Sequence, residues 1–135
     1  MADSWSSATE TAIFISIMAR YDHLLIFKST YNLCLLTYRL TWKYGRDYKY
    51  TLGEKMKEDA HGMLDILVET NSVANCEKGK LLNALLLKVE QFRMYARISC
   101  DLELITPESL GKVAELMEEI SKQAGAWKGW VESQR

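Results

Sequence analysis

Residues 81–105, LLNALLLKVEQFRMYARISCDLELI, decide the fold that we predict for this chain. When this stretch is placed on a helix, Leu81, Leu85, Val89, Phe92 and Ala96 fall on one face at steps of three and four residues. Other leucine, isoleucine and methionine residues spread apolar surface well beyond that face. A helix that is apolar over most of its circumference has packing neighbours on several sides. We therefore predict that this helix packs in its own bundle and also against another subunit.

Two places on the chain are candidates for that subunit contact. The first is the remaining apolar surface of residues 81–105, which runs beside a polar strip from Glu90 to Asp101. The second is the segment 125–130, GAWKGW, because glycine inside a helix costs about 1 kcal/mol relative to alanine and is typical of close helix packing. The oligomer interface predicted from these segments consists of Leu82, Leu86, Met94 and Trp127.

Three further helices are predicted from apolar periodicity and capping signals. One runs from about residue 21 to Gly45, which would take the left-handed conformation of a C-terminal cap. The next begins with a capping box at Thr51, Asn75 caps the helix that contains residues 81–105, and Thr106 caps the last helix ahead of a first-turn proline. The other three helices have the following predicted core positions. They are Leu24, Tyr31, Leu35, Tyr38 and Trp42 in the first helix, Leu52, Met56, Ala60, Met63 and Leu67 in the second, and Leu110, Val113, Met117, Ile120, Ala124, Trp127 and Val131 in the last.

Four helices of similar length joined by short turns predict an all-α fold, an up-down-up-down antiparallel four-helix bundle over residues 21–131. At 135 residues the chain fits a single domain. Residues 1–20 form an N-terminal extension, either a short helix or a continuation of the first long one, with a capping box at residues 7–10.

Composition limits the function. The net charge is −1, so a cationic field over the whole molecule is absent and any nucleic-acid contact would be a local patch. Cys34, Cys76 and Cys100 fit no metal-binding or CxxC spacing, which favours reduced thiols in a cytoplasmic protein. The apolar run AIFISIMA at residues 12–19 has no basic residue before it and is short, so we expect neither a signal peptide nor a membrane span.

Enzymatic chemistry finds little support in the sequence. Residues 58–61, EDAH, carry the Glu-x-x-His spacing of di-iron bundles, but the second motif that such a site requires is missing. Only two histidines occur, and neither a phosphate-binding glycine loop nor a nucleophile with a histidine partner is recognisable. We therefore expect no enzyme, no metal and no cofactor.

A basic and aromatic segment lies around the first turn. Its cations are Arg39, Lys43, Arg46, Lys49, Lys55 and Lys57, interleaved with tyrosines and Trp42. Cations beside exposed aromatic rings suit RNA, because the cations neutralise phosphates while the rings stack on unpaired bases. Acidic residues share the segment, however, and on the residues alone a solvated bundle end is favoured over an RNA site. Arg93 and Arg97 pose the same choice, since pairing with Glu90 and Asp101 on their own helix is the simpler explanation.

Four segments in this order resemble one known family. They are YTLGEK at 50–55, VEQFR at 89–93, ARISCDL at 96–102 and GAW at 125–127. Together they resemble the accessory variability determinant (Avd) proteins of diversity-generating retroelements, which are related to the four-helix-bundle proteins encoded in 23S rRNA intervening sequences. The similarity covers about residues 21–130.

This resemblance implies a non-enzymatic bundle that assembles into a ring-shaped homopentamer. It also implies binding to a reverse transcriptase and its template RNA during mutagenic cDNA synthesis, with the basic residues between Arg39 and Lys57 and the pair Arg93 and Arg97 as contact positions. The alternative is a structural or protein-interaction bundle of the intervening-sequence type without a nucleic-acid role.

Overall fold

The computed structural model describes residues 24–134, and these residues are helical apart from short connections. Four long helices, α2 (Leu24–Thr41), α4 (Leu52–Ser72), α5 (Asn75–Asp101) and α6 (Pro107–Ser133), are joined by α3 (Arg46–Lys49) and by turns. No strand occurs between residues 24 and 134. The predicted all-α fold with four long helices is therefore confirmed, while the extension over residues 1–20 and its capping box lie outside the described residues.

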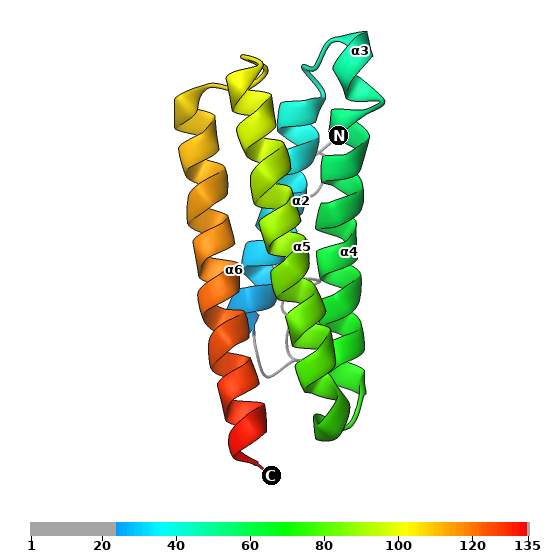
Figure 1. The fold of residues 1–135 in the computed structure, drawn as a ribbon, viewed down its shortest axis with the longest axis vertical. Coiled ribbons are helices and arrows are strands. Elements are labelled where there is room, and N and C mark those ends of the chain that lie inside the picture. The colour runs from blue at the N-terminus through cyan, green and yellow to red at the C-terminus, as the bar shows by residue number, and fades with distance from the viewer. Residues whose placement is uncertain (1–23, 135) are drawn as a thin grey trace, which may run out of the picture.

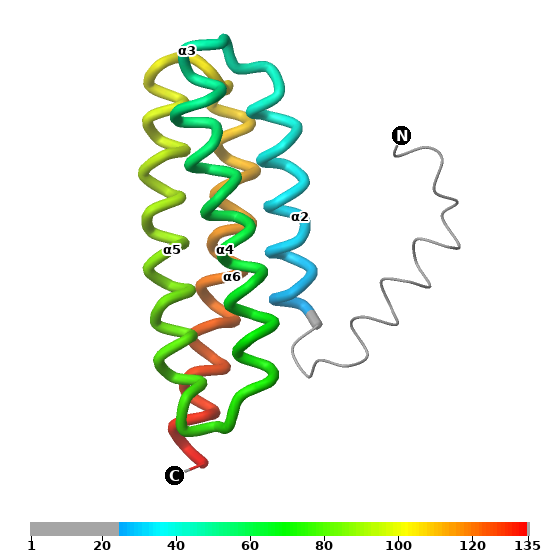
Figure 2. Tube along the Cα trace, turned by 90° about the vertical axis from the view of Figure 1, so that its right-hand side faces the viewer, coloured from blue at the N-terminus to red at the C-terminus, as the bar shows by residue number. Residues whose placement is uncertain are grey.

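The four long helices stand side by side as a bundle (Figures 1 and 2). The main contacts join α2 with α4, α4 with α5, α5 with α6, and α6 with α2. Consequently α5 lies diagonally across the bundle from α2, and Figure 1 shows α5 in front of it. The turn with α3 and the turn between α5 and α6 lie at one end of the bundle, and the turn between α4 and α5 lies at the other. Within the described part of the chain, no helix combines the length and the apolar character that crossing a bilayer would require.

The core surfaces of α4 and α6 are those predicted from the sequence, and the core surface of α5 differs only near its start, where Leu82 is fully buried and the predicted Leu81 is half-buried. Bulky apolar side chains at steps of three and four form one stripe on each helix, and burying these stripes against each other is the main favourable contribution to folding. Buried in this way are Met56, Ala60, Met63 and Leu67 of α4, Leu85, Val89, Phe92 and Ala96 of α5, and Val113, Met117, Ile120, Ala124, Trp127 and Val131 of α6.

The core surface predicted for α2 is wrong. Tyr38 and Trp42 are 46% and 75% exposed, whereas Thr30, Thr37 and Thr41 are buried together with apolar residues such as Leu33. The three threonine hydroxyls donate to the carbonyls of Ile26, Leu33 and Thr37, four residues earlier. Because each hydroxyl is satisfied within the helix, the threonine methyl groups enter the core without leaving a polar atom unpaired.

Three of the four predicted helix ends differ in detail. Gly45 is extended, with φ −62°, and is the N-cap of α3. Thr51 precedes α4 as predicted, but its hydroxyl donates to the carbonyl of Asp47 and makes no cap hydrogen bond. The N-cap of α5 is Ala74, so Asn75 is the first helical residue. Only Thr106 caps as predicted, since its hydroxyl oxygen accepts a hydrogen bond from the Ser109 amide at 3.0 Å.

The end of α5 contains an unexpected left-handed residue. Glu103 has φ 62°, and it is the only non-glycine residue with positive φ between residues 24 and 134. Its amide donates to the carbonyl of Cys100, and the amide of Leu104 donates to the carbonyl of Ser99. These two bonds form a Schellman motif, which usually has glycine at the left-handed position.

Candidate nucleic-acid interface

Six of the eight predicted cations gather at one end of the bundle, where α2 ends and α4 begins. Arg39 lies in the last turn of α2, Lys43 follows it, Arg46 and Lys49 lie in α3, and Lys55 and Lys57 lie near the start of α4. Arg39, Lys43, Arg46 and Lys55 are exposed, and Lys49 and Lys57 are half-buried. We call these six residues the basic end.

Side chains of the turn after α2 alternate between the core and the surface of the bundle. Tyr44 is 4% exposed and enters the core, where its hydroxyl donates to the Sδ atom of Met56 at 3.6 Å. Burial raises the pKa of the Tyr44 hydroxyl above its usual value, so this group stays protonated and remains a donor. Trp42, two residues earlier, points outward. The turn is thus anchored on one side and presents an indole on the other.

A cation–aromatic pair stands at the surface of the basic end. The Nζ atom of Lys49 lies 4.2 Å from the ring centroid of Trp42, within the range of a cation–π contact. Tyr50 follows α3 with 68% of its surface exposed. A large exposed ring beside ammonium groups is the arrangement that single-stranded nucleic acids use, because bases stack on the ring while phosphates approach the cations.

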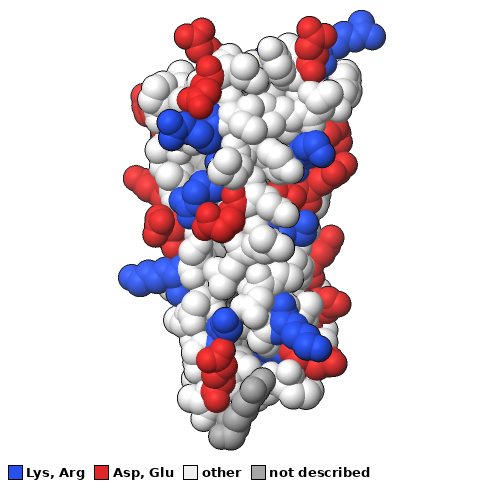
Figure 3. Space-filling view, in the orientation of Figure 1, with Lys and Arg blue, Asp and Glu red and all other residues white. Residues whose placement is uncertain are grey.

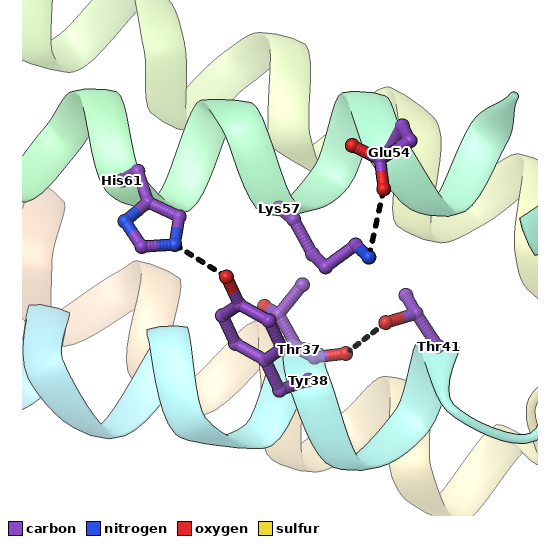
Figure 4. Close-up of polar contacts among 6 residues, drawn as sticks. All are labelled: Thr37, Tyr38, Thr41, Glu54, Lys57 and His61. Carbon is purple, nitrogen blue, oxygen red and sulfur yellow. Dashed lines mark hydrogen bonds and ion pairs between the residues drawn. The ribbon is translucent and has the colours of Figure 1, made fainter. Parts of the chain in front are cut away.

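A second polar group links α2 and α4 next to this pair (Figure 4). The hydroxyl of Tyr38 lies 2.7 Å from Nε2 of His61, and their rings meet edge to face. Lys57 lies 5.5 Å from the centroid of the Tyr38 ring and 2.9 Å from the carboxylate of Glu54. Part of the positive charge of the basic end is therefore neutralised locally. Figure 4 also shows the contrast between Tyr38, on the outer surface of α2, and Thr37, which belongs to the core side.

The two remaining predicted cations do not belong to the basic end. Arg93 and Arg97 lie on α5, the helix diagonal to α2. Arg93 pairs with Glu90 at 3.4 Å and approaches Glu118 of α6 at 3.9 Å, and Arg97 pairs with Asp101 at 3.3 Å. The structure thus separates the eight predicted contact residues into two groups on different surfaces.

The predicted oligomer interface also needs correction. Leu82 is fully buried and Trp127 is 4% exposed, so both belong to the core of a single bundle and are not available to a second subunit. Leu86 is half-buried against the core, and Met94 is 62% exposed. The exposed apolar residues that lie with Met94 are Leu87 and Ile98 of α5 and Leu102, the C-cap residue that follows it, at steps of four and seven residues. Counting these positions at 100° per residue from the core residues would have revealed this outer stripe.

The structure also contains a buried carboxylate that was not predicted from the sequence. Asp59 of α4 is 8% exposed and lies 3.7 Å from Nζ of Lys88 on α5. Desolvation raises the pKa of the Asp59 carboxyl, and the charge of Lys88 partly offsets this effect. His61 of the same EDAH segment faces outward toward Tyr38. Over residues 24–134, no three or more histidine, cysteine or acidic side chains are grouped so that they could hold a metal ion.

An open hollow of about 500 Å³ adjoins the basic end. It is bordered by Leu40 and Lys43 on one side and by Cys100 and the turn between α5 and α6 on the other. Lys43 therefore belongs both to the basic end and to the rim of this hollow.

A scan of the chain against models of known protein families found no match, and a search among curated proteins found none either.

Proposed function

We propose that this protein is a non-enzymatic RNA-binding bundle and that the basic end is its RNA site. In this proposal it is the accessory protein of a diversity-generating retroelement, and it binds the template RNA and the reverse transcriptase during mutagenic cDNA synthesis. The observation that carries the RNA site is the exposed indole of Trp42 with the ammonium group of Lys49 at 4.2 Å. The assignment of this protein to a diversity-generating retroelement is based on the sequence resemblance.

The arrangement favours unpaired RNA over a duplex. Trp42 and Tyr50 offer ring surfaces on which unstacked bases can stack. Arg46 and Lys49 lie between these two rings in the sequence, where they can bind the phosphates of the RNA backbone. A net charge of −1 makes this a local site, whose affinity depends on few phosphate contacts.

The assembly belongs to the same proposal. Consecutive long helices are neighbours and their short connections lie at alternating ends, so the topology that we infer is up-down-up-down and antiparallel. We further propose that several bundles form a ring-shaped homo-oligomer, a pentamer by the resemblance, in the cytoplasm.

The RNA site is tested by fluorescence anisotropy with a labelled, unstructured RNA of about 20 nucleotides, titrated with the purified chain at several salt concentrations. Stacking of a base on an aromatic ring contributes about 1–3 kcal/mol, so Trp42→Ala is expected to weaken binding roughly 5- to 150-fold. The matched control is Trp130→Ala, which removes an indole that is 51% exposed near the C-terminal end of α6. Equal affinities of the two variants would refute the site.

A salt series gives a second readout. The double variant Arg46→Glu and Lys49→Glu is expected to weaken binding and also to flatten the dependence of affinity on salt, because fewer counterions are released. Lys122→Glu is the control, since Lys122 is exposed on α6, a helix that contributes no residue to the basic end. Absence of RNA binding at low salt would favour the alternative function, a protein-interaction bundle. The exposed apolar stripe on α5 supports that alternative, because such stripes typically contact other proteins.

A further inference from the structure

The outer surface of α5 carries an apolar stripe that no part of the described bundle covers. Leu87, Met94, Ile98 and Leu102 are 60%, 62%, 41% and 46% exposed. At 100° per residue they fall within about 80° of each other and opposite the core residues of the same helix. Figure 3, which views the bundle from the side of α5, shows a mostly uncharged band along the molecule with charged side chains on both sides.

One flank of this stripe is charged in a self-complementary way. Glu90 and Arg97 are seven residues apart, two helical turns, so they lie on the same flank. Their side chains are 64% and 70% exposed. In the single chain each has one neighbour on its own helix, Arg93 for Glu90 and Asp101 for Arg97. Exposed contacts of this kind are weak and leave both groups able to bind a further partner.

From this geometry we propose that the stripe binds a second copy of this chain, with the two α5 helices antiparallel across a two-fold axis near Met94. A two-fold axis places the same surface of both copies in contact, and each flank then faces the same flank of the partner copy. An apolar seam with charged flanks is the pattern of helices that pair in solution. In this register, Leu87 of one copy lies at the level between Ile98 and Leu102 of the other.

The charged flank selects this register. With the axis just before Met94, Glu90 of each copy lies level with Arg97 of the other, so that two opposite-charge pairs form around the axis. A slide of the two helices by one turn in one direction would set Glu90 level with Asp101 of the other copy, which is repulsive. A slide by one turn in the other direction would set Glu90 level with Arg93 but Arg97 level with the uncharged Leu86, so the second pair of opposite charges would be lost. The contact is independent of the RNA site, because Trp42 and the basic end lie on α2, α3, the turn between these two helices and the start of α4. If a ring forms through another surface, the two-fold contact would join two rings.

The experiment is sedimentation velocity of the full chain over a range of protein concentrations. Met94→Glu is expected to halve the mass of the assembled species. Its far-ultraviolet circular dichroism and melting temperature should stay close to those of the wild type, since Met94 is mostly exposed. Lys122→Glu, a charge change at an exposed position of α6, is the control and should leave the mass unchanged.

Charge reversal tests the two-fold register directly. Glu90→Arg alone sets two arginines against each other across the axis, and Arg97→Glu alone sets two acids against each other, so each variant should show the halved mass. An equimolar mixture of the two variants should regain the wild-type mass. In the mixed pair, both flank positions of one copy are basic and both flank positions of the other are acidic, so each contact across the axis is again attractive.

Two results would overturn the proposal: a mixture that stays at the halved mass, or an unaltered mass in Met94→Glu. The RNA affinity of Met94→Glu should match that of the wild type, so failure of this contact and failure of the RNA site are told apart.

Discussion

The ammonium group of Lys88 on α5 reaches to within 3.7 Å of the carboxylate of Asp59 on α4. It does so across Gly62, where an added Cβ atom would lie 2.7 Å from Cε of Lys88. The other oxygen of Asp59, Oδ2, receives no hydrogen bond from residues 24–134. A carboxylate that is largely buried and only partly satisfied opposes folding, and the lysine reduces this cost without removing it.

The first prediction concerns the pH dependence of stability. Burial raises the pKa of the Asp59 carboxyl in the folded chain above its value in the unfolded chain. The folded state therefore binds the proton more tightly. The stability that proton binding by Asp59 contributes is fully present below the pKa of the unfolded chain and is lost as the pH rises through the pKa of the folded chain. Asp59→Asn, which stays neutral, should be more stable than the wild type at pH 7 and equal to it near pH 3.

Urea unfolding at a series of pH values between 3 and 7 measures this difference. Asp65→Asn is the matched control, because Asp65 lies exposed on the same helix, and its effect on the free energy of unfolding should not change with pH in this way. A destabilising effect of Asp59→Asn at pH 7 would contradict the prediction and would identify the ion pair with Lys88 as net favourable.

The second prediction uses Gly62 as a probe of the same contact. Alanine is favoured over glycine inside a helix by about 1 kcal/mol. With Lys88 present, the new methyl group must displace the lysine side chain, so Gly62→Ala should raise the free energy of unfolding by much less than this amount. In a Lys88→Ala background no lysine side chain has to move, and Gly62→Ala should raise the free energy of unfolding by the full amount. A double-mutant cycle on urea unfolding gives the coupling energy, which we expect to be about 0.5–1 kcal/mol. Equal effects of Gly62→Ala in both backgrounds would show that Lys88 does not lie over Gly62.

How far the sequence predicts this structure depends on which atoms form the core. On α4, α5 and α6 the core consists of large apolar residues, so their spacing predicts the buried surface directly, from Met56 to Val131. On α2 the buried surface includes Thr30, Thr37 and Thr41, whereas large aromatic residues lie outside. Ranking residues by size and hydropathy therefore selects the wrong side, and only the hydrogen bonds within the helix explain why threonine is accepted in the core.

The candidate site could be predicted only in its local part. The residues between Arg39 and Lys57 are close in sequence and stay close in space, because one turn and a four-residue helix connect them. Arg93 and Arg97 are cationic in the same way, but which helix lies diagonal to α2 is decided by the packing of all four helices. That Leu87 and Met94 lie opposite the core residues of α5 follows from counting 100° per residue along the sequence, but that no other described helix covers them is decided by the packing.

The third prediction concerns the turn between α5 and α6. Glu103 is left-handed, with φ 62°, a conformation that costs an L-residue roughly 1–2 kcal/mol and glycine almost nothing. Glu103→Gly should therefore stabilise the fold by about 1 kcal/mol, after the greater flexibility of glycine in the unfolded chain is subtracted. Glu108→Gly is the control, because Glu108 lies in the first turn of α6, where the same substitution should be destabilising. Thermal unfolding of both variants decides the matter, and a lower melting temperature for Glu103→Gly would contradict the left-handed conformation.

The fourth prediction compares two neighbouring residues of α2 that face opposite directions. Thr37 is 1% exposed and Tyr38 is 46% exposed, so a lysine at position 37 would bury an ammonium group and one at position 38 would reach water. We expect Thr37→Lys to lower the free energy of unfolding by about 3 kcal/mol or more. Tyr38→Lys should lower it by about 1 kcal/mol, mainly through loss of the hydrogen bond to His61. Thr37→Val should be nearly neutral, because the hydroxyl bonds only to the Leu33 carbonyl, which keeps its place in the helix. Urea unfolding of the three variants measures these changes, and the reverse order, with Tyr38→Lys the most damaging, would show that the aromatic side of α2 is its core.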